Sequence, residues 1–280
     1  MFQKARQPVI GLSTSSVYPE STGAAFEYAR KLGFGGVEVM VGVDKDSADV
    51  DALRRISEYH ELPVIAIHAP CLLATATVWG TDPWEKLKTA LDAAERLGAS
   101  TVVVHPPFRW QGSYATGFLE GVNELQSALD AQQKPLAIAV ENMYPWRGPL
   151  GLETRAYEPH WDPTNFDCAH LALDLSHAST AKQSSLELVR LWGSRLRHVH
   201  LTDGSGQHTD EHLLPGTGDQ RADAVLAAIA QNGFDGDVVL EVQMRTASSR
   251  AERERLLAES LAFAREHLRM EHDDWRTHRA

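Results

Sequence analysis

Short, almost continuously apolar segments recur along the chain, and more polar segments with a helical period lie between them. Uninterrupted apolar runs are typical of strands covered on both faces, because a strand with one face in water alternates between apolar and polar residues. The pattern predicts strands at residues 9–13, 35–40, 63–68, 100–105, 135–141, 170–174, 196–200 and 237–241.

Most of the intervals between these segments carry helix signals. Residues 22–36 end on glycines that suit a helix C-cap. Asp82 and Pro83 suit the N-cap and the first position of the helix that follows them. Further helices are predicted within residues 47–62, 117–132, 185–193, 221–233 and 248–268.

The alternation of strands and helices predicts an α/β fold, a single (β/α)8 barrel over residues 1–270, with a frayed tail over residues 271–280. A doubly wound open sheet is the alternative. It is disfavoured because the first strand continues into GLSTSSVYP and no Gly-rich GxGxxG turn follows it. Residues 142–168 break the rhythm, and they predict a long irregular loop after the fifth strand.

Composition narrows the class of protein. A chain of 280 residues with 43% apolar residues can bury one large core, and it lacks both a secretory leader and an apolar run long enough for a membrane span. Its two cysteines, Cys71 and Cys168, are far apart, which suits reduced thiols and a cytoplasmic location. A net charge of −11 disfavours nucleic acid as a partner, although bound divalent cations would reverse the field locally.

Side chains that bind metals stand where one predicted strand after another ends. Each alone is open to another interpretation: a carboxylate as a salt bridge or helix cap, a histidine as a hydrogen-bonded core residue. A barrel brings the carboxyl ends of its strands to one face, so together they predict a metal centre with carboxylate and imidazole ligands. The strand-end residues are His68, His105, Glu141, Asp174, His200 and Glu241.

Two local pairs extend this set. His177 follows Asp174 by three residues where the chain leaves a strand, so both can reach one site. Asp210 and His212 lie two apart in an extended loop, which predicts that they point the same way. His198 shares a face of its strand with His200 but lies one layer deeper, which predicts packing or an outer partner of the ligands. His208 lies near enough in sequence to compete with His212.

The irregular loop and neighbouring cations are candidates for substrate binding. A long loop on the catalytic face is often a lid or a substrate wall, and an ordinary surface elaboration is the alternative. Its aromatic residues Tyr144, Trp146 and Trp161 could stack on a sugar. Arg109, Arg147 and Lys45 are the nearest loop cations for a phosphate, unless they are solvated surface charges.

At these residues the chain resembles the endonuclease IV and xylose isomerase-like TIM barrels, over residues 9 to 265. The motifs are HAP at 68–70, VVHP at 103–106, EN at 141–142, LDLSH at 173–177, HLTD at 200–203, DEHLLPGTG at 210–218 and LE at 240–241. The resemblance to endonuclease IV implies up to three zinc ions, with Glu141 bridging two of them. It implies the ligands His68, His105, Glu141, Asp174, His177, His200, Asp210, His212 and Glu241.

Two departures set the chain apart from endonuclease IV. The family's arginine- and glutamine-bearing DNA loop is replaced by the acidic VGVDKDSADVD, and an expected aromatic residue is replaced by Cys71. The sugar isomerase and epimerase branch implies a smaller site, a single Mn or Mg ion held by Glu141, Asp174, His200 and Glu241. In that branch the two glutamates flank the substrate carbons and His177 contacts the substrate.

Three functions follow from these observations. The first is a metal-dependent isomerase or epimerase of a small sugar or sugar phosphate, with Glu141, Glu241 and His177 as catalytic residues. The second is a zinc-cluster hydrolase of phosphoesters in a sugar phosphate, a nucleotide or abasic DNA, which would use all nine ligands. The third is metal or sugar binding without catalysis. The acidic surface and the altered loop favour the first, with hydrolysis as the alternative; the oligomeric state stays open.

Overall fold

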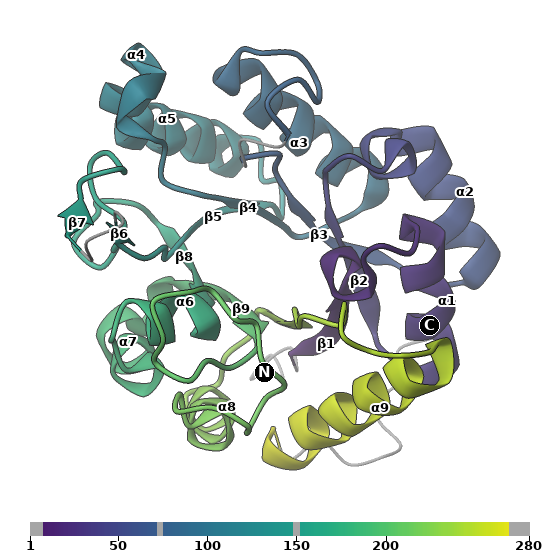
Figure 1. The fold of residues 1–280 in the computed structure, drawn as a ribbon. Coiled ribbons are helices and arrows are strands. Elements are labelled where there is room, and N and C mark those ends of the chain that lie inside the picture. Colours follow the sequence, from purple (N-terminus) through teal and green to yellow (C-terminus); the bar gives the residue numbers. More distant parts are fainter. Residues whose placement is uncertain (1–7, 72–74, 148–151, 269–280) are drawn as a thin grey trace, which may run out of the picture.

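The computed structural model describes residues 8–71, 75–147 and 152–268. Its centre is a closed barrel of parallel strands in the order β1–β10–β9–β8–β5–β4–β3–β2 (Figure 1). The strands are β1 Val9–Ser13, β2 Gly36–Met40, β3 Val64–His68, β4 Thr101–Val104, β5 Ala137–Glu141, β8 His170–Asp174, β9 Leu196–Leu201 and β10 Asp237–Leu240. The (β/α)8 barrel is confirmed, and the open sheet is excluded because β1 pairs with both β2 and β10.

The helices form a ring outside the barrel (Figure 1). They are α1 Thr22–Leu32, α2 Val50–His60, α3 Pro83–Leu97, α4 Ser113–Thr116, α5 Phe118–Ala131, α6 Leu175–Thr180, α7 Ser185–Trp192, α8 Ala222–Gln231 and α9 Arg250–His267. The predicted caps are present: Asp82 accepts hydrogen bonds from the amides of Trp84 and Glu85 at 2.8 and 3.2 Å, and Gly33 ends α1 with a φ of +87°. The short helices α4 and α6 were not predicted.

The strands have two buried faces, which explains their continuous apolar character. Val102 and Val104 pack into the large core between the barrel and the helices. Val103, between them, instead packs with Ala139 and Ala172 in a separate small cluster inside the barrel. For each of these three residues, the residue two positions later also faces inward and lies at the carboxyl mouth of the barrel. The residues at the mouth are the predicted ligands His105, Glu141 and Asp174.

The long segment between β5 and β8 is irregular, as predicted, apart from one small antiparallel sheet. Its strands are β6 Trp146–Arg147 and β7 Glu153–Thr154. The segment is fixed to the loop after β4 by a cluster of Phe108, Met143, Ala156 and Tyr157, against which Tyr144 and Trp161 pack. It therefore forms a structured wall beside the mouth of the barrel.

Both cysteines are free, as expected from their separation. Cys168 is buried in the main core and Cys71 packs against that core, so they serve there as small apolar side chains. Among the described residues no helix has the length and apolar character needed to cross a membrane. The predicted frayed tail, residues 271–280, lies outside the described residues.

Candidate metal centre

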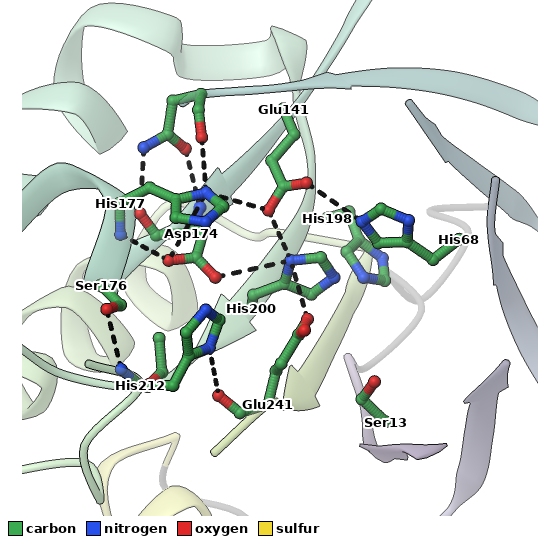
Figure 2. A network of polar contacts seen from close by, with 12 residues as sticks. Ser13, His68, Glu141, Asp174, Ser176, His177, His198, His200, His212 and Glu241 are labelled. Carbon is green, nitrogen blue, oxygen red and sulfur yellow. Dashed lines mark hydrogen bonds and ion pairs between the residues drawn. The ribbon is translucent and has the colours of Figure 1, made fainter. Parts of the chain in front are cut away.

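The nine predicted ligands converge at the carboxyl mouth of the barrel. Figure 2 labels all of them except His105 and Asp210. Glu141 lies at their middle and is almost completely buried. Its Oε1 lies 2.9 Å from His200 Nδ1, while its Oε2 lies 3.2 Å from His68 Nε2 and 2.9 Å from His105 Nε2. The two oxygens of one carboxylate thus face different imidazoles, which is the arrangement that a bridging ligand needs.

The remaining ligands surround His200 and His177. His200 Nδ1 lies 3.3 Å from Glu241 Oε2 and 3.7 Å from Asp174 Oδ2. Asp210 Oδ2 lies 3.3 Å from His177 Nε2 and 2.9 Å from His212 Nε2. The donor atoms form three overlapping groups whose members lie within 4.8 Å of one another: His68 with His105 and Glu141, Glu141 with Asp174 and His200, and Asp174 with His177 and His212.

Three of the imidazoles are oriented by backbone carbonyls. The Nδ1 atoms of His68, His177 and His212 lie 3.1, 2.8 and 3.0 Å from the carbonyl oxygens of Ala69, Asn142 and Glu241. A neutral imidazole that donates from Nδ1 keeps its lone pair on Nε2. Nε2 of each of the three rings faces a carboxylate of the centre, and His177 Nδ1 also lies 3.4 Å from Glu141 Oε1. The backbone therefore presents these rings in a form that can bind a metal through Nε2.

Local structure explains the position of Asp174 and His177. Asp174 ends β8 and caps α6, since its Oδ1 accepts a hydrogen bond of 2.7 Å from the amide of His177. The side chain of Asn142 binds both backbone groups of Asp174, at 2.8 Å to the amide and 3.0 Å to the carbonyl. Hydrogen bonds therefore hold the carboxyl ends of β5 and β8 together next to the ligands Glu141 and Asp174.

The loop that carries Asp210 and His212 is held by residues that the sequence analysis missed. The Ser176 hydroxyl donates a hydrogen bond of 2.7 Å to Asp210 Oδ1 and accepts from the amides of Glu211 and His212 at 3.1 and 2.9 Å. The buried carboxylate of Asp203 accepts from the amides of Gly204, Gly216 and Gln220. The motifs LDLSH and HLTD contained both residues, but nothing in their spacing showed that they would contact this loop.

Glu38 is the other residue that was missed. It lies in the middle of β2, is fully buried, and contacts His198 and His200 on β9 from beneath the nine ligands. The available signal was a single charge inside the apolar run GGVEVM. His198 lies one layer deeper than His200, as predicted, and it contacts Glu38.

The electrostatics of the centre call for a cation. Asp174 Oδ2 and Glu241 Oε2 are buried without a hydrogen-bond partner among the described residues. Burial opposes protonation of His177 and His200, but nearby carboxylates outweigh it: Asp174 and Asp210 raise the pKa of His177 to about 10, and Glu38 and Glu241 raise the pKa of His200 well above its usual value. Protons thus compensate the carboxylates in the metal-free protein, and a divalent ion could replace them.

The donor set fits such an ion. Imidazole nitrogens and carboxylate oxygens are the ligands that Zn, Mn and Fe accept in proteins. The Asp174 and Glu241 oxygens that lack a hydrogen bond among the described residues both face His200 Nδ1. That the nine residues act as ligands stays a prediction, and their placement agrees with it.

The candidate substrate residues divide into two groups. The Tyr144 ring lies 5.2 Å from that of His177, so it borders the centre. Trp146 packs on Phe108 and Trp161 is part of the loop cluster, so both build the wall. Their role in substrate binding stays a prediction.

The candidate cations are engaged elsewhere in the structure. Arg109 pairs with Glu158 at 3.4 Å, and Arg147 pairs with Glu153 at 2.9 Å. His208 is exposed and contacts Arg147 rather than a member of the centre, so it does not take the place of His212. Lys45 is exposed. A phosphate would have to compete with these carboxylates for either arginine.

A cavity of about 220 Å³ opens beside His105. Prolines and aromatic rings contribute to its wall, among them Pro107, Trp110 and Tyr114, and Gln111 and Lys86 add polar groups. Lys86 Nζ donates to the carbonyls of Thr75 and Ala76, both at 2.8 Å. Of the nine predicted ligands, His105 alone lines this cavity, which therefore adjoins the edge of the centre.

The chain belongs to the xylose isomerase-like TIM barrel family, whose model matches residues 26–267. An uncharacterized protein of Mycobacterium leprae (strain TN) is 49% identical over 94% of this chain and 99% of its own length. An inosose dehydratase of Clostridium perfringens is 22% identical over 75% of this chain and 78% of its own length. D-psicose 3-epimerase from Clostridium cellulolyticum, solved with D-tagatose, superposes with a TM-score of 0.66 over 93% of this chain and 99% of that one, at 16% identity.

Proposed function

We propose that the protein is a divalent-metal-dependent enzyme that moves a proton on a small sugar or sugar phosphate, as isomerases and epimerases do. The observation that carries the proposal is a pair of buried glutamates at the ends of β5 and β10. Glu141 and Glu241 lie 2.9 and 3.3 Å from the same nitrogen, His200 Nδ1. Two carboxylates that close to one ligand can share an ion and still reach a substrate bound to it.

Glu141, Asp174, His200 and Glu241 would hold the ion that this reaction needs. When bound, it would polarise a carbonyl and a neighbouring hydroxyl of the sugar and so acidify the C–H bond of the hydroxyl-bearing carbon next to the carbonyl. His177, whose ring borders Tyr144, would contact the substrate from the side.

The two glutamates have opposite electrostatic environments, which favours different roles. Burial alone would raise the pKa of Glu141, but the imidazoles of His200 and His105 hold it well below its usual value. Burial does raise the pKa of Glu241, although His200 and His212 act against it. A carboxylate with a raised pKa accepts and returns protons more readily. Glu241 is therefore the better proton carrier, and the Ser15 hydroxyl orients it by a hydrogen bond of 3.1 Å to Oε1.

The surroundings support a small, polar substrate. Tyr144, which packs against the structured wall after β5, borders the centre, and the net charge of −11 disfavours a polyanion. Two relatives are named for reactions on D-psicose and inosose. These names support a sugar-like substrate for this chain.

Solvent deuterium exchange tests the proposal directly. The metal-loaded protein is incubated in D2O with a panel of ketohexoses, their phosphates and inososes. Proton NMR follows the loss of the signal from the proton on the carbon next to the carbonyl. We expect exchange that requires the metal and a content of one exchangeable Mn or Mg per chain. Absence of exchange across the panel, in protein that does bind metal, would refute proton transfer as the reaction.

Phosphoester hydrolysis at a zinc cluster is the second candidate, and one observation favours it. A single-metal isomerase needs only four ligands, yet His68, His105, His177, Asp210 and His212 also lie within reach of the shared carboxylates. Three tightly held zinc ions per chain, together with phosphate release from a sugar phosphate or a nucleotide, would favour hydrolysis over the isomerase.

A further inference from the structure

We propose that Glu38 is a positioning residue that fixes the metal ligand His200 from the layer beneath it, and that His198 braces Glu38 in turn. The inference rests on the proposed metal centre. It concerns two residues that lie outside the nine ligands, one on β2 and one on β9.

The contact geometry defines this role. Glu38 Oε1 lies 3.1 Å from His200 Nε2, and Glu38 Oε2 lies 3.2 Å from the same nitrogen. Glu38 Oε2 also lies 2.8 Å from His198 Nε2. All three side chains are completely buried. One carboxylate is therefore hydrogen-bonded to His200 and lies at ion-pair distance from His198, whose ring nitrogens make no hydrogen bond among the described residues.

This contact selects which nitrogen of His200 can bind metal. A proton on Nε2 is donated to Glu38, which leaves the lone pair on Nδ1. Nδ1 is the atom that faces Glu141, Asp174 and Glu241 (Figure 2). His200 would thus bind through Nδ1, whereas His68, His177 and His212 are anchored at Nδ1 and would bind through Nε2.

The anchor of His200 differs from the others because it is charged. A carboxylate that accepts a hydrogen bond from a ligating imidazole makes that ring a stronger electron donor, and loss of such a partner weakens metal binding. His68 and His212 are hydrogen-bonded at Nδ1 to a neutral carbonyl. His177 Nδ1 is hydrogen-bonded to the Asn142 carbonyl at 2.8 Å, and Glu141 Oε1 lies further away at 3.4 Å. Glu38 would therefore strengthen the bond to one particular ion, the one shared by Glu141, Asp174, His200 and Glu241.

The surroundings of Glu38 agree with a dedicated role. The barrel interior also holds the small apolar residues Val103, Ala139 and Ala172, so an apolar side chain could have filled position 38. The β2–β3 register shifts between Val37 and Glu38, and the β8–β9 register shifts at Leu171 and Ala172, where Ala172 pairs with His198. Such irregularities re-aim side chains beside functional sites.

The test compares E38Q with the unchanged protein and with D237N. The amide introduced by E38Q can still accept a hydrogen bond from His200 but carries no charge. Asp237 is also a buried carboxylate on a strand, but it lies at the amino end of β10, away from the carboxyl mouth that holds the centre. It accepts a hydrogen bond from Ser100. Competition with a chelating dye gives the Mn and Zn affinities of each protein.

We expect E38Q to bind the ion about 10- to 100-fold more weakly and D237N to bind it as the unchanged protein does. Equal affinity in E38Q and the unchanged protein would overturn the role of Glu38 while leaving the metal centre intact. If the unchanged protein binds no divalent ion, the proposed function itself fails.

A second measurement needs no variant and covers the case in which E38Q does not fold. Long-range proton–nitrogen NMR of the zinc-loaded protein reports which nitrogen of each histidine carries a proton. We expect one ring, His200, to be protonated at Nε2 and metal-bound at Nδ1. A His200 ring that binds zinc through Nε2 would contradict the inference.

Discussion

At the scale of single residues, burial and neighbouring charges separate groups of the same chemical type. Glu141 contacts imidazoles with both oxygens, so its ionised form is strongly favoured. Glu241 keeps one oxygen without a hydrogen-bond partner among the described residues, and its ionised form is disfavoured. The sequence shows both only as glutamates that end apolar runs. Their different roles depend on contacts from other strands.

Substitution of the two glutamates tests this difference. E241Q should lower kcat at saturating metal by about 10²- to 10⁴-fold, because the proton carrier is lost, and should also weaken metal binding, because Glu241 is one of the four proposed ligands. E141Q should abolish turnover and also release metal, because this residue contacts three imidazole ligands at 3.2 Å or less. Kinetics and metal analysis of each purified variant provide the measurement, with E259Q on the exposed face of α9 as the matched control. Turnover by metal-loaded E141Q would contradict the role of Glu141.

At the scale of elements, the site is made of strand ends and one loop, and they are fixed in different ways. The strand ends are held by the barrel, whose register aligns Asp174 with His200. The loop that carries Asp210 and His212 has no strand or helix of its own and is held by Ser176 on α6 and by Asp203. The sequence predicted that Asp210 and His212 point the same way. It could not predict what holds them, because Ser176 lies more than thirty residues away in the chain.

Removal of the Ser176 hydroxyl should loosen this loop. S176A leaves the amides of Glu211 and His212 and one oxygen of Asp210 without their partner. We expect a loss of about 1–3 kcal/mol in the free energy of unfolding and weaker binding of any ion that contacts His212. Denaturant unfolding and metal titration measure the two effects. S260A is the control, since the buried Ser260 hydroxyl bonds only a carbonyl within α9; an equal response in both variants would argue against a special role for Ser176.

At the scale of the whole molecule, the barrel gathers many ionisable groups into one buried place. The carboxylates there keep protons on His177, His200 and His212, whose pKa values are raised above their ordinary values against the effect of burial. Protons and metal ions therefore compete for the same imidazoles. Metal binding should release protons and should stabilise the whole fold in a way that depends on pH.

The thermal midpoint should record this competition. Because the folded-state pKa of His177 is about 10, its proton is still bound across neutral pH and must leave when metal binds. At fixed excess Mn, the stabilisation that the metal adds to the free energy of unfolding should increase as the pH rises from about 6 to 8. The increase should be about 1.4 kcal/mol per pH unit for each released proton, or roughly 3–6 °C in Tm. Calorimetric scans with and without Mn measure the increment. A metal-induced rise in Tm that does not change with pH would contradict proton displacement.

The sequence by itself determined the alternation of strands and helices and the set of side chains at the strand ends. Both follow from local periodicity: a strand buried on both faces must be apolar until it reaches the mouth, where a polar side chain becomes tolerable. The outward-facing Val102 and inward-facing Val103 show this directly.

Only the tertiary structure decided which nitrogen of each imidazole faces the centre and which carboxylate oxygens lack a hydrogen bond among the described residues. These features arise from contacts between strands that are distant in the chain, such as Glu38 on β2 and His200 on β9. The two strands are not hydrogen-bonded neighbours in the sheet. Their side chains meet because the barrel closes and directs them to the same interior space, and no pattern along the chain encodes that meeting.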